Sequence, residues 1–417
     1  MTFTDPVSPL ARLVFAGVTA GCLCAPVQAG CGVEQGGLRL LSDDWAALNL
    51  IAERAGECAG EGVTVDSQRT REHKALQVPG LSVTPARYTS AVVSNNTIVP
   101  LLDGGLIRPL DELVERFAPN LPERQLIRID GLIMAIAFNA NAQHLYYRED
   151  LLDEVGLAPP ATYDELLEAA STLRSAGIEQ PLVGTLAAGW DLANEFLNLY
   201  LGLDARPFQA GSAEPAIQGE AGIQALQTLK ALSEYMDPDF LSIDSNELQS
   251  IWQSGSAALA VGWNSRADAL LDSAGDAPEV AERTALSAAP AMADGAPPAA
   301  ALWWNGFTIA SNIAADEAEA SFLIMLHAID PALLDEHAAV STWLIEGYEP
   351  TATSQGLMAN VEAGAKPYPM LAPMGLLHTA IGDNLADYLQ GSESAEQALA
   401  DAAEAYRTTA REQGFIE

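Results

Sequence analysis

Short apolar segments of strand length alternate with amphipathic helical segments along most of this chain, and this alternation constrains the fold most. The first strand is predicted at residues 38–41 and a helix at 45–55, with further strands at 63–65, 89–93 and 131–139. Apolar periods of two and of 3.6 residues that alternate in this way are typical of α/β proteins with mostly parallel sheets. A chain of 417 residues is also long enough to form two lobes.

Residues 145–173 (LYYREDLLDEVGLAPPATYDELLEAASTL) predict two helices with a proline-marked boundary between them. Pro159 and Pro160 cannot continue the first helix. Thr162 then begins the second helix, and Glu165 three residues later completes a capping box. The pair is expected to lie on a larger domain and to carry no chemistry of its own.

The N-terminus has the pattern of an export signal. Residues 10–27 are apolar and rich in small residues, Arg12 supplies a positive charge, and Ala29 ends a small-residue cleavage site. We therefore expect residues 1–29 to be a signal peptide and the mature protein to be periplasmic. Two Ala-Gly-Cys triplets leave lipoprotein anchoring as a less favoured alternative, because the residue before each triplet fits a lipid-attachment box poorly.

Two of the four cysteines, Cys31 and Cys58, lie beyond the predicted signal peptide. Cys31 precedes the first strand and Cys58 follows the first helix, so both are expected at the same end of the sheet. In an oxidising compartment a disulfide between them is plausible and would stabilise the fold by about 3–4 kcal/mol on the loop-entropy model. Two unpaired thiols are the alternative.

The chain is strongly acidic, with 56 acidic and 20 basic residues and a formal net charge of −36. Such a surface repels nucleic acid and anionic lipid, so neither is expected as a partner. We interpret the charge as a means of solubility in a salty habitat rather than as a device that attracts a ligand. No apolar run of about 20 residues follows the first thirty, so no membrane span is expected in the mature chain.

Motifs of enzymes and of cofactor sites are not found. The sequence contains no P-loop, no HExxH, no GxSxG and no CxxC. Its five histidines have no ligand spacing, so we expect no metal site. We therefore expect neither catalysis nor a cofactor, although any two of the many carboxylates could in principle form a glycosidase pair.

Several tryptophans stand beside polar residues near predicted strand ends or turns. Flat aromatic faces flanked by Asp, Asn or Arg suit a pyranose, which has apolar C–H faces and a rim of hydroxyls. Positions after the carboxyl ends of strands are where ligands bind in open α/β sheets. The candidate ligand-binding residues are Asp43, Asp44, Trp45, Asn95, Trp190, Asp191, Trp263, Asn264, Arg266, Trp303, Trp304 and Asn305. The competing interpretation is that the tryptophans are core residues and that Asp43 or Asp44 only caps the first helix.

The segment 145–173 closely resembles the YYNKDLF…GL-PP-TWDEL segment of bacterial extracellular solute-binding proteins of the carbohydrate branch, which are similar to maltose-binding protein. Three further stretches agree with this resemblance and follow in the same order: IWQSGSAALAVGW (251–263), WWNGFTIASN (303–312) and YLQGSESAEQALADAAEAY (388–406). The resemblance covers most of residues 38–410. In these proteins, positions that match Trp190, Trp263 and the 303–305 group lie in the cleft between lobes.

The resemblance implies a two-lobe periplasmic-binding-protein fold of the type II kind, with several hinge crossings. The N-terminal lobe would comprise residues 30–138 plus 306–345, and the C-terminal lobe residues 139–305 plus 346–417. The implied function is that of the substrate-binding component of an ABC importer. As a monomer, it would close on a neutral sugar, short oligosaccharide or polyol and deliver this ligand to a membrane permease.

Two alternatives remain open at this stage. The same tryptophans and carboxylates could hold a cationic ligand, such as a quaternary ammonium or a polyamine, by cation–π contact. A glycoside-active enzyme of similar size is a more remote alternative, and turnover of a chromogenic glycoside would distinguish it from a receptor.

Overall fold

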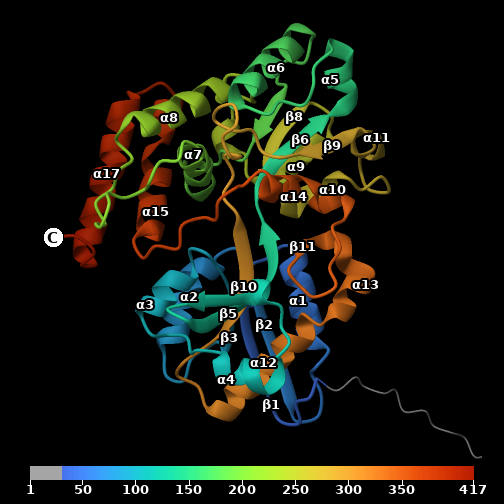
Figure 1. Cartoon of the computed structure of the whole chain (residues 1–417), viewed down its shortest axis with the longest axis vertical. Helices are drawn as coiled ribbons and strands as arrows, with labels where there is room; N and C mark the ends of the chain where they lie inside the picture. Colours follow the sequence, from blue (N-terminus) through green and yellow to red (C-terminus); the bar gives the residue numbers. More distant parts are fainter. Residues whose placement is uncertain (1–30) are drawn as a thin grey trace, which may run out of the picture.

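Two β-sheets, each with its own hydrophobic core and its own helices, form the two lobes of the protein (Figure 1). The structure is a computed structural model and describes residues 31–417. The predicted signal peptide, residues 1–29, lies outside the described residues. Among these residues, no helix combines the length and the apolar character needed to cross a bilayer.

The larger sheet, with its surrounding helices, is called the N-lobe here. It has seven strands in the order β11-β5-β10-β3-β1-β2, and β4 pairs with β5 outside this path. The strands are β1 (Gly36–Ser42), β2 (Val63–Arg69), β3 (Ser90–Ser94), β4 (Leu126–Ile129), β5 (Leu132–Asn141), β10 (Trp303–Ile309) and β11 (Thr342–Trp343). Around them lie helices α1 (Ala46–Gly56), α2 (His73–Ser82), α3 (Ile98–Asp103), α4 (Asp111–Phe117), α12 (Ala315–Ala328) and α13 (Leu334–His337).

The smaller sheet, with its helices, is called the C-lobe. Its four strands run in the order β7-β8-β6-β9 and are β6 (Gln143–Arg148), β7 (Leu182–Gly184), β8 (Leu259–Trp263) and β9 (Thr284–Ser287). The helices of its first part are α5 (Glu149–Val155), α6 (Tyr163–Ser175), α7 (Trp190–Gly202), α8 (Glu220–Ser233), α9 (Ser245–Gln253), α10 (Ala267–Leu270) and α11 (Pro278–Ala281). Those of its last part are α14 (Gln355–Glu362), α15 (Met374–Asn384), α16 (Ala386–Leu389) and α17 (Ala395–Glu412).

The expectation of mostly parallel sheets is wrong. Only β1 with β2, β1 with β3, and β7 with β8 pair in parallel among the described strands, and the other ladders are antiparallel. One reason is the tight turn at Asp130 and Gly131, which joins β4 and β5 as a hairpin, and a second is the connection between the lobes. β5 runs almost directly into β6, with only Ala142 between them, and β10 returns to the N-lobe beside β5 in the opposite direction.

Strand pairing indicates where the chain passes between the lobes. Residues 139–141 of β5 pair with residues 303–305 of β10 in the larger sheet. Ile345 still belongs to the N-lobe core, and α14 contacts β6 and β9 of the C-lobe. We therefore propose crossings near residue 142, near residue 302 and between residues 345 and 355.

The predicted helix pair is present as α5 and α6, and the predicted capping box is confirmed. The Thr162 hydroxyl accepts from the Glu165 backbone N–H at 3.2 Å, and the Glu165 carboxylate accepts from the Thr162 N–H at 3.2 Å. Pro159 and Pro160 lie between the two helices, where no helical hydrogen bond has to be made. The buried face of α6 then packs into the C-lobe core through residues such as Leu166 and Leu173.

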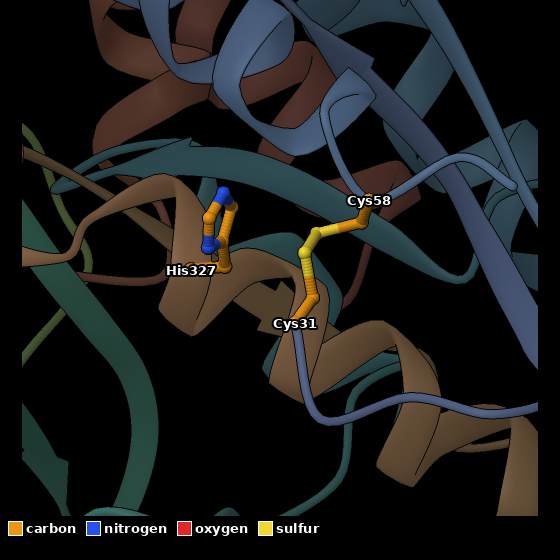
Figure 2. Close-up of side chains that lie close together, drawn as sticks. All are labelled: Cys31, Cys58 and His327. Atoms are coloured by element: carbon orange, nitrogen blue, oxygen red, sulfur yellow. A yellow bond between two sulfur atoms is a disulfide. The ribbon is translucent and has the colours of Figure 1, made fainter. Parts of the chain in front are cut away.

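The predicted disulfide between Cys31 and Cys58 is present, with the two Cα atoms 5.6 Å apart (Figure 2). Ligand-type atoms of these cysteines and of His327 lie within 4.8 Å of one another. Because both sulfurs are joined to each other and not free thiolates, we assign this group to the disulfide rather than to a metal site.

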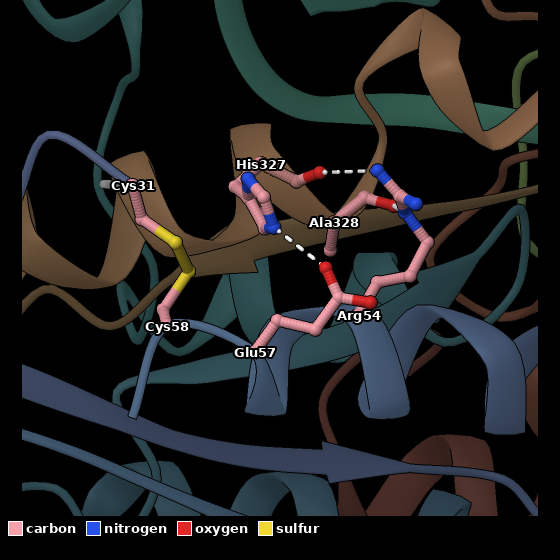
Figure 3. Close-up of a disulfide and its surroundings, with 6 residues drawn as sticks. All are labelled: Cys31, Arg54, Glu57, Cys58, His327 and Ala328. Atoms are coloured by element: carbon pink, nitrogen blue, oxygen red, sulfur yellow. Dashed lines mark hydrogen bonds and ion pairs between the residues drawn. A yellow bond between two sulfur atoms is a disulfide. The ribbon is translucent and has the colours of Figure 1, made fainter. Parts of the chain in front are cut away.

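The disulfide lies where the ends of α1 and α12 meet (Figure 3). Arg54 donates to the carbonyls of Ala328 and His327, at 3.2 and 3.3 Å, which are among the last carbonyls of α12. His327 Nε2 lies 3.0 Å from the Glu57 carboxylate. The bridge therefore fastens the segment before β1 to a helix end that polar contacts already hold in place.

Candidate functional site

A cavity of about 410 Å³ lies between the two lobes. Its N-lobe wall comes from the turns that follow β1, β2 and β3, which are the mutually parallel strands of this sheet. Its C-lobe wall comes from the N-termini of α7 and α9 and from the turn after β8. Ligands of open α/β sheets bind at such carboxyl ends of parallel strands, and this volume lies within the usual range of ligand pockets.

Most of the predicted ligand residues line this cavity. They are Asp43, Asp44, Trp45, Trp190, Asp191, Trp263, Arg266, Trp303 and Asn305. Asp43 and Asp44 do not cap α1, because its N-cap is Trp45 and no side chain accepts a cap hydrogen bond there. Both aspartates lie in the turn after β1, and both line the cavity.

Asn95, Asn264 and Trp304 do not line the cavity. Asn95 is buried, and its side chain binds the backbone of Trp304, Leu302 and Tyr368. Asn264 is also buried and donates to the Thr342 hydroxyl at 3.1 Å. Trp304 packs against the N-lobe core. The structure therefore places Asn95 and Asn264 in contacts between the lobes and Trp304 in the N-lobe, and none of the three on the cavity wall.

Three tryptophans form a cluster on one side of the cavity. The Trp190 ring centroid lies 6.0 Å from that of Trp263 and 5.7 Å from that of Trp303. Trp303 is also stacked on Tyr368, with ring centroids 4.0 Å apart. Trp263 and Trp303 keep only 9% and 7% of their surface exposed, so each offers little indole surface to the cavity.

His378 contacts both the ring and the backbone carbonyl of Trp190. The two rings are stacked with centroids 5.0 Å apart, and His378 Nε2 lies 2.9 Å from the Trp190 carbonyl oxygen. Burial lowers the pKa of His378 to about 3, so this imidazole is neutral at neutral pH. A neutral ring can donate from Nε2 to the Trp190 carbonyl and accept from the Tyr368 hydroxyl at Nδ1, 2.9 Å away.

Lys74 reaches across the cleft from α2 in the N-lobe to α7 in the C-lobe. Its Nζ lies 3.8 Å from the centroid of the Trp190 ring. Lys74 as a whole residue is exposed, but desolvation by the cleft atoms around its ammonium lowers its pKa, while the nearby Asp43 and Asp191 carboxylates favour its charged form. Within residues 31–417, Nζ has no hydrogen-bond acceptor and no carboxylate oxygen within 4.0 Å.

The carboxylates of the cavity are only partly neutralised. His73 Nδ1 lies 3.6 Å from Asp43, but burial lowers the pKa of His73 to about 4, so it adds no charge at neutral pH. Burial raises the pKa of Asp191 to about 6, and Lys74 opposes this shift. Arg71 lies 3.8 Å from Asp244 across the cleft, an exposed ion pair of small energetic weight.

Arg266 points toward the N-terminus of α9. Its guanidinium donates to the Ser245 hydroxyl at 2.8 Å and to the Gln249 side chain at 3.5 Å. Burial lowers its pKa, and Asp244 partly opposes this effect. Asp244 itself caps α9 by accepting from the Asn246 and Glu247 backbone N–H groups at 2.7 and 3.0 Å.

Two groups of cavity residues were not predicted from the sequence, in addition to single positions such as Asn141, Asp268 and Val340. The first group comprises Arg71, His73 and Lys74, which follow β2. The predicted strand at 63–65 was too short, because β2 extends to Arg69. With the correct strand end, the expectation that ligands bind after the carboxyl ends of strands would have included these residues. The second group lies at the start of α9, where the Asp-Ser-Asn-Glu sequence is a helix N-terminus signature. It comprises Asp244, Ser245, Asn246 and Gln249.

The comparisons with known proteins agree with this geometry. A sequence profile of the bacterial extracellular solute-binding proteins matches residues 89–324, which is more than half of the chain. The chain therefore belongs to the family of bacterial extracellular solute-binding proteins. This family agrees with the one that the sequence motifs resemble, and the two-lobe fold is consistent with it.

Solved structures from three bacteria have the same fold. The ribitol complex of a solute-binding protein from Agrobacterium radiobacter is 19% identical, has a TM-score of 0.77 and covers 89% of this chain and 98% of its own. The D-mannitol complex of a solute-binding protein from Agrobacterium vitis is 18% identical, has a TM-score of 0.75 and covers 92% of this chain and 100% of its own. Maltose-bound MalE3 of T. maritima is 17% identical, has a TM-score of 0.75 and covers 89% of this chain and 99% of its own.

Proposed function

We propose that this chain is the periplasmic binding component of an ABC importer for a neutral sugar, short oligosaccharide or polyol. The ligand enters the cavity between the lobes, and hinge closure places groups from both walls around it. The closed monomer then presents its ligand to a membrane permease. The ribitol, mannitol and maltose bound by proteins of the same fold support this choice of ligand class.

The observation that carries the proposal is the mixture of charges in one cavity. Five carboxylates line it, together with Arg71, Lys74 and Arg266. A hydroxyl group both donates and accepts hydrogen bonds, so an uncharged polyhydroxylated ligand can satisfy carboxylates and cationic donors at once. An anionic ligand would face an excess of carboxylates, and a cationic ligand would meet the Lys74 ammonium at the Trp190 ring.

Isothermal calorimetry and thermal-shift measurements with a panel of sugars and polyols test the proposal. At least one ligand should bind stoichiometrically and raise the melting temperature by mass action. The same ligand should compact the protein in small-angle scattering. A parallel panel of betaines and polyamines, and a chromogenic glycoside assay, address the two alternatives. Saturable binding of only the cationic panel, or glycoside turnover, would contradict the proposal.

Two tryptophan variants locate the site. Trp45 is half-buried and lines the cavity, so Trp45→Ala should weaken sugar binding by about 1–3 kcal/mol through loss of aromatic contact. Trp304 is half-buried in the same lobe but does not line the cavity, and Trp304→Ala is the matched control. A larger loss of affinity in the Trp304 variant than in the Trp45 variant would place the ligand elsewhere.

A further inference from the structure

Lysine is rare in this protein, and one lysine lines the cleft. The chain has three lysines, Lys74, Lys230 and Lys366. Lys230 donates to the Leu389 carbonyl, and Lys366 pairs with Asp204 at the surface. Lys74 alone lines the cavity, and it has no such partner within residues 31–417. Its position therefore needs an explanation other than an ordinary ion pair.

The surroundings of the Lys74 ammonium are those of a cation site. The Trp190 indole lies beneath it at 3.8 Å, and Asp43 and Asp191 are the carboxylates that act on it. An aromatic face with carboxylates nearby is the arrangement by which proteins recognise ammonium ligands. Here the ammonium comes from the opposite lobe of the same chain.

We propose that Lys74 is a specificity-determining residue that fills a built-in cation site over Trp190 and thereby excludes alkylammonium ligands from the cleft. The space beside the ring cannot hold a second cation, because Lys74 blocks it sterically and repels like charge. The lysine is tethered to α2, so it competes at high effective concentration with any free cation. The exclusion leaves uncharged polyhydroxylated ligands, and in this respect the inference rests on the proposed function.

Removal of the Lys74 ammonium should convert the cleft into an alkylammonium site. The probe is tetramethylammonium, titrated by calorimetry into the wild-type protein and into Lys74→Ala. We expect Lys74→Ala to bind it at least about tenfold more tightly than the wild type, which corresponds to a cation–π contact in a partly desolvated site. Asp191→Asn in the Lys74→Ala background should reduce this gain, because it removes one of the two nearby carboxylates.

Matched variants distinguish the effect of the charge at residue 74 from the effect of removing any lysine or of lowering the stability of the protein. Lys74→Arg keeps a cation that can stack on the ring and should continue to exclude tetramethylammonium. Lys366→Ala removes a lysine outside the cavity and should behave as the wild type. Lys74→Gln keeps most of the side-chain length without the charge and provides a second neutral variant should the alanine variant fold poorly, which thermal melting checks.

The outcomes distinguish this inference from the proposed function. If neither Lys74→Ala nor Lys74→Gln gains affinity for tetramethylammonium, or if the wild type binds it equally well, the inference is wrong. A gain in the variants without any sugar or polyol binding by the wild type would support the inference and contradict the proposed function. Sugar binding by the wild type without a gain in the variants would support only the proposed function.

Discussion

Asp191 is the cavity carboxylate whose environment most disfavours its charge. Burial raises its pKa to about 6 from the ordinary value of 3.8, even though Lys74 and Arg266 act in the opposite direction. Because the folded-state pKa is the higher one, the folded protein holds this proton more tightly than the unfolded chain does. The Asp191 contribution to the free energy of unfolding therefore decreases as the pH rises from about 4 to about 6.

Asp191→Asn should remove this pH dependence, because an amide does not ionise. Relative to the wild type, the Asp191→Asn variant should therefore become more stable as the pH rises from 4 to 7. The change should be on the order of 2 kcal/mol, after allowance for partial solvent screening. Urea denaturation of both proteins at pH 4 and pH 7 measures it, and a difference that does not change with pH would contradict the pKa shift.

At this scale the sequence predicted aromatic and acidic cavity residues better than basic ones. Asp43, Asp44 and Trp45 follow a strongly apolar strand whose end is easy to locate. Lys74 follows β2, whose last residues Asp66 to Arg69 are polar and hide the strand end. No local signal marks a side chain that crosses to the other lobe, so the contact of Lys74 with Trp190 could only come from the tertiary structure.

The junction of α7 and α15 determines where Trp190 lies. Gly189, with φ of +96°, precedes Trp190, and its N–H donates to the Gly382 carbonyl at 3.3 Å. A Cβ on Gly382 would lie within 3.0 Å of three Gly189 backbone atoms, so the two helices approach each other backbone to backbone. The position of the indole therefore depends on the absence of a side chain at residue 382.

Gly382→Ala should destabilise the protein by about 1–3 kcal/mol through overpacking and should weaken ligand binding, because Gly189 and Trp190 must shift. Gly375→Ala, in the same helix, is the control, since a Cβ there meets no atom within 4 Å. The control should lose neither stability nor affinity. Thermal denaturation and calorimetry of both variants provide the comparison, and equal behaviour of the two would refute a role for the close contact.

The disulfide is a second feature at the level of elements. It closes a loop with a sequence separation of 27 residues between Cys31 and Cys58. On the loop-entropy model, Cys31→Ser with Cys58→Ser should lower the free energy of unfolding by about 3–4 kcal/mol. Ligand affinity should stay within about twofold, because neither cysteine lines the cavity. Denaturation of the double variant beside the reduced and oxidised wild type measures the loss, and an unchanged midpoint would contradict it.

The elements themselves were largely predictable, and their pairing was not. Strand-length apolar runs located β1, β3 and β5, and the proline pair with its capping box located α5 and α6. Whether a strand pairs in parallel or antiparallel depends on the lobe from which the chain comes. The local sequence of β10 does not show that the chain comes from the C-lobe, so its antiparallel pairing with β3 and β5 could not be predicted. The prediction of mostly parallel sheets was therefore wrong for the strands that join the lobes.

For the whole molecule, the net charge of −36 is the dominant electrostatic feature. Mutual repulsion of the carboxylates destabilises the compact state, and salt screens it. The melting temperature should therefore rise as NaCl increases from about 0.05 M to about 1 M, because the Debye length shortens over this range from above about 10 Å to about 3 Å. The affinity for an uncharged ligand should change much less. A melting temperature that falls with salt would show that other interactions outweigh the repulsion.

Asn95 has a consequence for how such a molecule opens. From the N-lobe, its one side chain binds the backbone on either side of a crossing, at Leu302 and Trp304, and also the Tyr368 carbonyl. Any swing of one lobe against the other that preserves these bonds must have its pivot beside this amide. Residues near the pivot would then travel little, and the parts of each lobe farthest from Asn95 would move through the widest arc.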